Sequence, residues 1–486
     1  MIDIAKSSAV ELAAAIRRRE LGSLELLDAY AARIDRLNGP VNAVVFLDLE
    51  RARARAREAD AALARGESWG PLHGLPVTVK DAFETAGIRS TGGFPPWADH
   101  VPEADATIVA RNVAAGAIVF GKTNLPVLSA DLQSYNPIYG TTNNPWNVER
   151  APGGSSGGSA VSTACGFTAF ETGSDIGGSI RTPSNWCGIY GHKPTHGIIP
   201  QRGHLPGPPG TLGEPDLAVV GPMARSADDL ELLLGIQAGP SSDRSRAWRL
   251  ELPSPRREKL SEYRVAAWLD DDAFPVDPAV RAVLAGAVQS LRAAGASVDE
   301  GARPAFRLAD LFDTYFRLLS PVMAAGFPPE QFDAMKAMAE AMPADARDGM
   351  TLMARYGTGL TRDWLAANEA RERYRVAFAD FFTRYDVLLT PVTPITAVPH
   401  DHDEPMPMRT ITVGGATRPY LDLLSWISPA TCCLLPATVA PVGLASDGMP
   451  VGVQIVGPYL EDRTTIDFAR HLAGAVGGFV APPMPR

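Results

Sequence analysis

Glycine and serine are concentrated in residues 153–197, and this concentration constrains the fold of the chain more than any other feature of its sequence. Two runs stand out there, Gly153-Gly154-Ser155-Ser156-Gly157-Gly158 and Gly173-Ser174-Asp175-Ile176-Gly177-Gly178-Ser179-Ile180-Arg181. Glycine is favoured where the backbone must turn tightly or approach a ligand closely, because it carries no β-carbon. Ordinary loops do not concentrate glycine so locally, and the pattern makes Ser155 and Ser179 candidate functional residues.

Two common motif matches fail on their sequence context. Residues 153–157 match the nucleophile elbow G-x-S-x-G, and the chain has eight histidines for a Ser-His-Asp triad. An elbow follows an apolar strand, however, and residues 146–152 do not predict one, while His192 is interpreted as structural or solvated. Residues 116–123 match the phosphate-loop pattern, but residues 117–120 between their glycines have the sequence of a buried strand. Neither a histidine triad nor nucleotide binding is favoured.

Lys80 ends the apolar run Leu75-Pro76-Val77-Thr78-Val79. A serine hydroxyl becomes an effective nucleophile when a base removes its proton, and a lysine can be that base only when it is neutral. Burial lowers the pKa of an ammonium group and so supplies the neutral form. Taken alone, Lys80 is better interpreted as a surface lysine paired with Asp81, but the two serine motifs favour a catalytic base.

The segment Pro76–Asp81 and the two glycine-serine runs together resemble the amidase signature family. The two serines lie 24 positions apart and Lys80 lies 75 positions before Ser155. This spacing is similar to that of the family's Lys, cis-Ser, Ser triad. The resemblance extends over about residues 12–471 and includes four further segments, residues 121–126, 191–195, 221–225 and 450–457.

The resemblance implies a role for each matching residue. Ser179 would be the nucleophile, Ser155 a proton relay that follows a cis peptide bond, and Lys80 the base. Glycines beside the nucleophile let backbone N–H groups converge on a developing oxyanion. Substrate binding of this kind is expected at Ile176, Gly177 and Gly178. Supporting hydrogen bonds are expected from three more residues, Asp175, Arg181 and Ser156.

The expected fold is α/β, with a single α/β/α body around a mixed central sheet of many strands, as the resemblance implies. Local patterns agree with it. Residues 8–11 predict a capping box for a helix through about Arg19, and Ser23 predicts the cap of a second helix. From Pro71 onward, short apolar runs alternate with helical stretches. No linker interrupts the chain, so one domain over residues 1–486 is expected, with a signature core over about residues 71–235.

Composition restricts partners and location. The net charge of -10 and the pI near 5.4 argue against a nucleic-acid-binding surface. The arginines of residues 51–57 are predicted to lie on a solvated helix face. The sequence has no apolar signal core at its start and no run of 18 apolar residues, which indicates a cytoplasmic protein without membrane association. The four cysteines form no C-x-x-C pair, and the resemblance implies neither a metal nor an organic cofactor.

The expected substrate is a small-molecule amide, aryl amide or carbamate (a urethane). Residues 323–353 hold six of the 12 methionines, and residues 201–216 are rich in glycine and proline. Methionine adapts to irregular apolar space, so these segments can form a pocket or lid over an apolar group, although a methionine-bearing core helix fits equally well. Self-association into a homo-oligomer stays open.

Two other functions fit parts of the sequence. The glutaminase subunit of a tRNA-dependent amidotransferase is similar in length and triad, but Gly197-Ile198-Ile199-Pro200 replaces the Gly-Arg-Val-Ser run expected there. A catalytically dead scaffold is the non-enzymatic alternative. The presence of all three triad residues argues against it.

Overall fold

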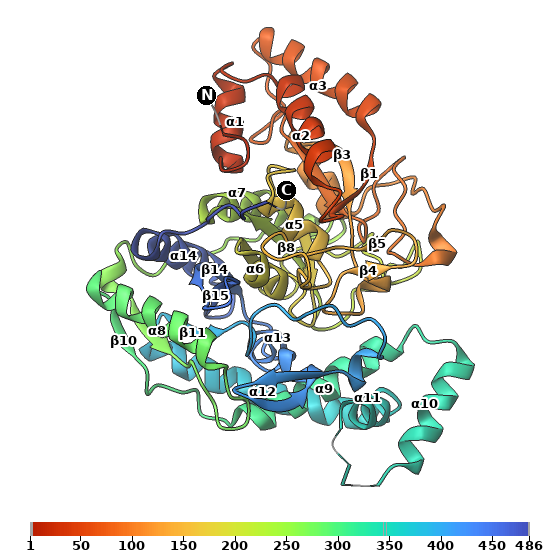
Figure 1. The fold of residues 1–486 in the computed structure, drawn as a ribbon, viewed down its shortest axis with the longest axis vertical. Coiled ribbons are helices and arrows are strands. Elements are labelled where there is room, and N and C mark those ends of the chain that lie inside the picture. Colours follow the sequence, from red (N-terminus) through yellow and green to blue (C-terminus); the bar gives the residue numbers. More distant parts are fainter. Residues whose placement is uncertain (1–2, 344, 347, 485–486) are drawn as a thin grey trace.

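A mixed eight-stranded sheet forms the centre of the computed structural model, which describes residues 3–343, 345–346 and 348–484 (Figure 1). Its strand order is β10-β9-β11-β15-β14-β7-β8-β6. The pairs β10/β9 and β9/β11 are parallel, and the other pairs are antiparallel. The predicted mixed sheet of many strands is therefore confirmed. The strand bounds are β6 Glu171–Asp175, β7 Tyr190–Lys193, β8 Val219–Ala224, β9 Arg264–Ala267, β10 Ser297–Asp299, β11 Val387–Pro391, β14 Ala437–Leu444 and β15 Pro450–Val456.

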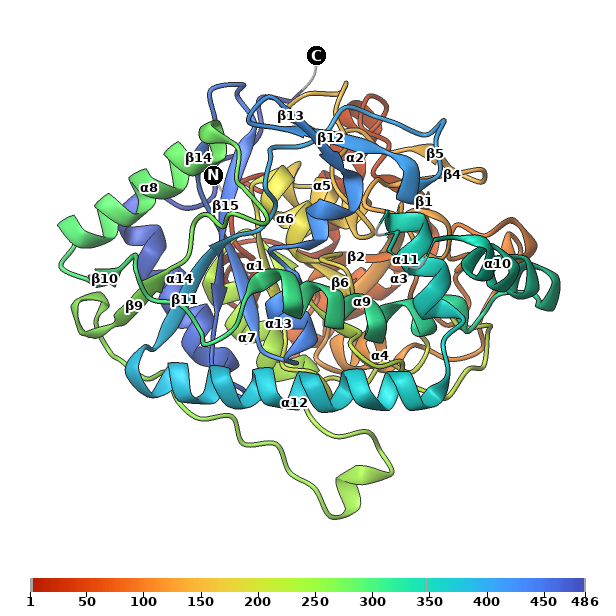
Figure 2. The same ribbon diagram turned by 90° about the horizontal axis from the view of Figure 1, so that it is seen from below.

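Helices cover both faces of this sheet (Figure 2). On β15, Gln454 and Gly452 face helix α6, whereas Val453 and Ile455 point to the opposite face and are also buried. No helix among the described residues is long and apolar enough to cross a membrane. The helix bounds are α1 Ala9–Arg17, α2 Ser23–Leu37, α3 Leu49–Ala64, α4 Thr107–Ala114, α5 Gly157–Ala164, α6 Arg181–Cys187, α7 Ala227–Gln237, α8 Pro278–Ala293, α9 Leu308–Ala324, α10 Pro329–Ala341, α11 Gly349–Gly357, α12 Thr361–Arg384, α13 Ser428–Cys432 and α14 Asp462–Val476.

A smaller three-stranded sheet lies beside the large one, with the order β1-β3-β2. Its strands are β1 Val44–Leu47, β2 Pro76–Lys80 and β3 Ile118–Thr123. Strand β2 contacts β6, the edge strand of the large sheet, so the end of β2 lies next to the turn that follows β6. Two short hairpins, β4 Tyr135–Asn136 with β5 Gly140–Thr141 and β12 Thr410–Val413 with β13 Ala416–Pro419, complete the strands of the described residues.

The structure also argues against the phosphate loop and against a histidine triad. Residues 118–123, which would form most of a phosphate loop, are strand β3, and Lys122 is buried with its ammonium donating to Phe83 O at 2.6 Å. His192 lies in the core, where its ring nitrogens contact Thr438 Oγ1 at 2.9 Å and Asp462 Oδ1 at 3.1 Å. Of the two interpretations of His192, structural or solvated, the structure supports the structural one.

Of the two caps predicted for the N-terminal helices, one is confirmed and one is wrong. Ser8 caps α1 in the predicted capping box with Glu11. Helix α2, however, is capped at Gly22, and Ser23 is its first residue. The cause is a distant carboxylate: Asp60 of α3 accepts the N–H groups of Ser23 at 2.7 Å and Leu24 at 3.1 Å. A tertiary contact thus replaces the local cap. The arginines of residues 51–57 lie on α3, as predicted, with buried alanines on its other face.

Candidate active site

Lys80, Ser155 and Ser179 come from three separate elements that meet where the two sheets adjoin. Lys80 ends β2, Ser155 lies just before α5, and Ser179 lies in the turn between β6 and α6. The Lys80 ammonium nitrogen, Nζ, lies 2.7 Å from Ser155 Oγ, within hydrogen-bond distance. The peptide bond between Gly154 and Ser155 is cis, as the family resemblance implies. The structure therefore brings the predicted base and the predicted relay into direct contact.

Lys80 is 0% exposed, and its polar contacts are hydroxyl groups. Besides Ser155, its Nζ contacts Ser174 Oγ at 2.9 Å and Ser156 Oγ at 3.1 Å. Burial lowers the pKa of Lys80 to about 7, although the charges of Asp175 and Glu171 act to raise it. A neutral amine keeps one lone pair, so one neighbouring hydroxyl must then donate to it. Near neutral pH the side chain can accept a proton through Ser155.

Ser174 is a contact of the base that sequence reasoning did not single out. It lies on β6 inside the same glycine-serine block, two residues after Thr172 and directly before Asp175. Its backbone N–H donates to Ser156 Oγ at 3.3 Å, and this links the two serine runs around Lys80. The alternation of side chains between the two faces of β6 could have indicated Ser174, because Ser174 and Thr172 share the face that is opposite to that of Gly173.

Asp175 fixes the turn that carries Ser179. Its carboxylate accepts the N–H groups of Gly178 at 3.0 Å and Ile180 at 3.1 Å. It also pairs with the buried Arg181 guanidinium, at 2.8 and 3.0 Å. Burial alone would raise the pKa of Asp175, but the charge and hydrogen bonds of Arg181 hold it below its ordinary value. Arg181 in turn donates to Ile427 O at 2.8 Å and Gln454 Oε1 at 2.7 Å, which anchors the turn to the large sheet.

The three residues expected to bind substrate differ in the hydrogen bonds of their backbone N–H groups. Gly178 was expected to bind substrate, but its N–H already donates to Asp175. Gly178 instead adopts a φ of +84°, where a β-carbon would be strained and would lie 2.8 Å from Thr182 Oγ1. The N–H groups of Ile176, Gly177 and Ser179 form no hydrogen bond with any residue that the structure describes. These three are the candidate donors to an oxyanion.

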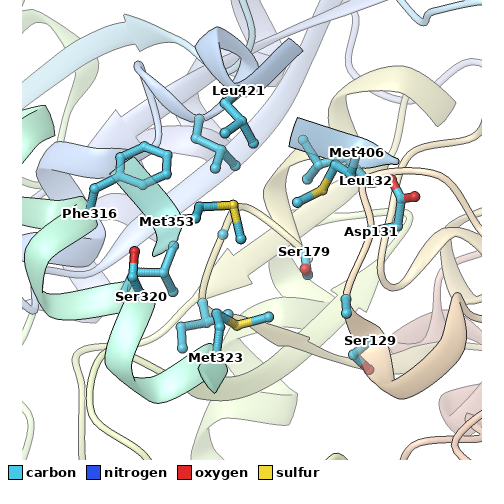
Figure 3. A pocket seen from close by; sticks show the side chains of 15 residues that line it. Ser129, Asp131, Leu132, Ser179, Phe316, Ser320, Met323, Met353, Met406 and Leu421 are labelled. Atoms are coloured by element: carbon cyan, nitrogen blue, oxygen red, sulfur yellow. The ribbon is translucent and has the colours of Figure 1, made fainter. Parts of the chain in front are cut away.

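A cavity opens at Ser179, and its walls are mainly apolar (Figure 3). Its volume is about 60 Å³, room for roughly four to six water molecules. Asp131 is the charged lining residue, and Arg409, itself 3% exposed, holds both of its carboxylate oxygens at 2.8 and 3.0 Å. The lining residues are Ser129, Ala130, Asp131, Leu132, Ile176, Gly177, Ser179, Phe316, Leu319, Ser320, Met323, Met353, Met406, Leu421 and Leu424.

The two segments expected to shape a pocket have different outcomes. Met323 and Met353, at the ends of the methionine-rich segment, line the cavity together with Met406. Residues 201–216 are not among the described lining residues. The cavity at Ser179 thus takes lining from residues 323–353 and none from residues 201–216.

Asp175→Asn is expected to lower the free energy of unfolding by about 3–5 kcal/mol, because it leaves the buried Arg181 charge unpaired. The matched control is Asp28→Asn, which breaks the half-exposed ion pair with Arg53 and should cost less than about 1 kcal/mol. Denaturant unfolding, followed by circular dichroism and fluorescence, measures both. Similar losses in the two variants would contradict this account of the turn.

Comparisons with known proteins agree on one family. A family model described as Amidase matches residues 25–466. A glutamyl-tRNA(Gln) amidotransferase subunit of Prochlorococcus marinus (strain MIT 9303) is 33% identical, over 93% of this chain and 94% of that protein. A solved amidase is similar with a TM-score of 0.77 and 28% identity, over 97% of this chain and 100% of that one. The structure of 6-aminohexanoate cyclic dimer hydrolase is similar with a TM-score of 0.77 and 26% identity, over 98% of both chains.

The amidotransferase relatives overturn the prediction about partners. A small-molecule amide or carbamate substrate and no nucleic acid were expected, yet these relatives are named as subunits of an enzyme of glutamyl-tRNA(Gln). The expectation of no nucleic acid rested on the net charge of -10 of this chain alone. Net charge restricts only the surface of this chain, because a basic surface for tRNA can lie on another polypeptide of the assembly.

Proposed function

This chain belongs to the amidase family, and from that premise we propose that it hydrolyses an amide C–N bond through an acyl-enzyme on Ser179. In the proposed mechanism, Ser179 attacks the amide carbonyl carbon while Ser155 accepts its proton and passes one to Lys80. The N–H groups of Ile176, Gly177 and Ser179 stabilise the oxyanion. Lys80 then returns a proton through Ser155 to the leaving nitrogen, and water hydrolyses the acyl-enzyme.

The observation that carries this proposal is the environment of Lys80. It is fully buried and its ammonium contacts three serine hydroxyls at 2.7, 2.9 and 3.1 Å. Two other buried lysines, Lys122 and Lys193, each donate to a backbone carbonyl oxygen, which has no proton to exchange. A buried lysine surrounded by hydroxyl groups instead suits a base that exchanges protons with them.

The cavity supports an apolar acyl group on the substrate. Phe316, Met323, Met353, Leu421 and Leu424 present carbon and sulfur to it, and the Asp131 carboxylate is held by Arg409. Burying an ammonium or carboxylate against such walls without a partner would cost several kcal/mol. We therefore propose an amide whose acyl group is a hydrocarbon chain or ring.

A second candidate function is favoured by the relatives rather than by the cavity. At 32–33% identity over nearly the whole chain, several are named as glutamyl-tRNA(Gln) amidotransferase subunits. They support this candidate more strongly than they support the first one. In that role the chain would release ammonia from glutamine and would act with partner proteins on a charged tRNA.

Two para-nitroanilides that differ only in the acyl group distinguish the candidates. We expect kcat/KM for the hexanoyl compound to exceed that for the γ-glutamyl compound by roughly 100-fold, because the latter must bury two charges in the cavity. Release of para-nitroaniline measures both, and Ser179→Ala controls for uncatalysed hydrolysis. A preference for the γ-glutamyl compound would instead support the amidotransferase role. If the enzyme hydrolysed neither compound, the first candidate would fail.

A further inference from the structure

Ser320 places one unsatisfied hydroxyl group in the wall of the acyl cavity. It lies on α9 and is 3% exposed, yet its Oγ forms no hydrogen bond with any residue that the structure describes. Phe316 and Met323 flank it on the same helix, and Met353 approaches from α11 (Figure 3). A polar atom is therefore buried in a wall where its protein neighbours are apolar.

Helical position does not explain the missing partner. A serine or threonine inside a helix can donate to the carbonyl oxygen four residues earlier. On the same helix Thr314 does so, with Oγ1 at 3.0 Å from Asp310 O. Ser320 does not, although the same kind of acceptor lies one turn before it. Its hydroxyl is therefore left without a partner among the described residues, while Ser320 itself lines the cavity.

An unsatisfied buried hydroxyl lowers the affinity of a wholly apolar ligand and raises that of a ligand that can bond to it. We propose that Ser320 is a specificity-determining residue that hydrogen-bonds a neutral polar group, such as a hydroxyl, at the far end of an otherwise apolar acyl chain. This inference rests on the first candidate function and names its substrate class more closely. A charged end group does not fit, because the lining offers no free charge to pair with it.

The test uses linear acyl para-nitroanilides from butanoyl to octanoyl, each with and without a terminal hydroxyl group. Because Ser320 is fixed on α9, the hydroxyl should help only at the chain length that reaches it. At that length we expect the hydroxyl to raise kcat/KM of the wild-type enzyme by roughly 10-fold. Ser320→Ala should remove this advantage and speed the hydrolysis of the plain chains, because the unsatisfied hydroxyl is gone from the wall. Ser320→Thr, which keeps the hydroxyl, should restore part of it.

Thr314→Val is the matched control, because the Thr314 hydroxyl is already satisfied within the helix. It should leave the ratio between the two series unchanged. Titration of Ser179 with a fluorophosphonate normalises every rate to active enzyme. The inference is overturned if no chain length gains from the hydroxyl, or if Ser320→Ala keeps the gain. If no member of either series is hydrolysed, the proposed function fails and this inference fails with it, an outcome distinct from hydrolysis at equal rates.

Discussion

Ser179→Ala is expected to reduce amide hydrolysis by roughly 10⁴- to 10⁶-fold and to abolish the acyl-enzyme. Ser179 lines the cavity and lies in the turn that Asp175 holds in place. Its hydroxyl lies beside backbone N–H groups that form no hydrogen bond with the described residues, so it can attack where the resulting oxyanion is stabilised. Intact-mass spectrometry with a slowly hydrolysed amide measures the covalent adduct directly.

Ser290→Ala provides the matched control for this experiment. Ser290 lies on α8, and its hydroxyl donates to Gly286 O at 3.1 Å, away from the site. The control should keep both the adduct and the rate. An adduct that persists in Ser179→Ala would show that another residue is the nucleophile, and peptide mapping would identify it.

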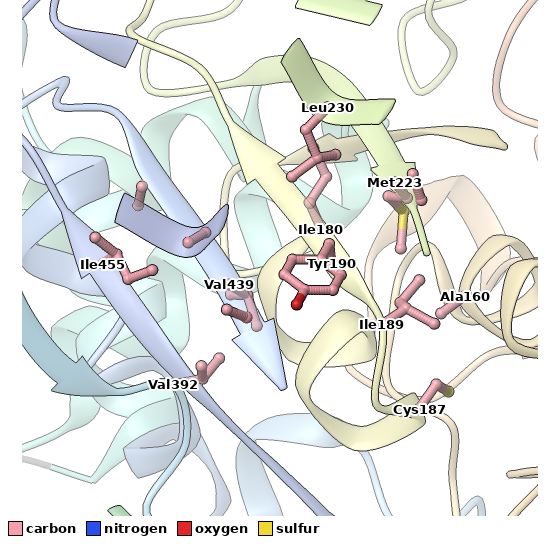
Figure 4. Close-up of a cluster of buried hydrophobic side chains, with 14 of the residues drawn as sticks. Ala160, Ile180, Cys187, Ile189, Tyr190, Met223, Leu230, Val392, Val439 and Ile455 are labelled. Atoms are coloured by element: carbon pink, nitrogen blue, oxygen red, sulfur yellow. The ribbon is translucent and has the colours of Figure 1, made fainter. Parts of the chain in front are cut away.

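The three candidate triad residues could be singled out because their signals are local in the sequence, and their catalytic roles are our proposal. Glycines around Ser155 and Ser179 and the apolar run before Lys80 are adjacent to the residues whose roles they indicate. The core that supports them follows similar local patterns. Ile180, Ile189 and Tyr190 meet Val439 of β14 in one buried cluster (Figure 4). Apolar periodicity predicts which of these residues are buried, and so it supported the α/β fold.

The remaining features depend on contacts between distant segments. The hydrogen bond from the Gly178 N–H to the Asp175 carboxylate could not be predicted from the sequence, because it depends on how the turn folds. The cap of α2 was mispredicted because Asp60 reaches it from α3. The cavity combines α9, α11 and residues 406–424 with the nucleophile turn. Sequence patterns predict elements and their faces, but they do not predict which faces meet.

The same dependence on distant contacts applies to how the chain is divided into a signature core and the segments around it. We propose one domain over residues 1–486, with a signature core over about residues 71–235, because the end of β2 and the turns before α5 and after β6 in that core supply all three proposed triad residues. The acyl cavity, by contrast, takes much of its lining from outside this core. Chemistry and substrate choice would then be encoded in different parts of the chain, so substitutions in α9 or α11 can change the substrate while the triad stays intact.

Lys80→Ala should lower amide hydrolysis by roughly 10³- to 10⁴-fold but ester hydrolysis by less than about 10²-fold. The reason is the leaving group: an amine must receive a proton before it departs, whereas para-nitrophenolate leaves without one. The matched substrates are hexanoyl para-nitroanilide and hexanoyl para-nitrophenyl ester, which form the same acyl-enzyme. Equal losses on both would remove the claim that Lys80, through Ser155, protonates the leaving nitrogen. An unchanged amide rate would remove Lys80 from the mechanism.

The pH dependence tests the same base independently. Because Lys80 acts only when neutral, kcat/KM of the wild-type enzyme should rise with pH through about 7, the value to which burial lowers its pKa, and fall below it. Two other buried groups titrate in the same range: burial raises the pKa of Glu171 to about 7 and lowers that of Lys193 to about 7. The Lys80→Ala variant distinguishes these groups. If Lys80 causes the rise in rate near pH 7, the residual ester hydrolysis of this variant should no longer show that rise. A rise that persists in the variant would assign the titration to Glu171 or Lys193 and would leave Lys80 without its role as the base.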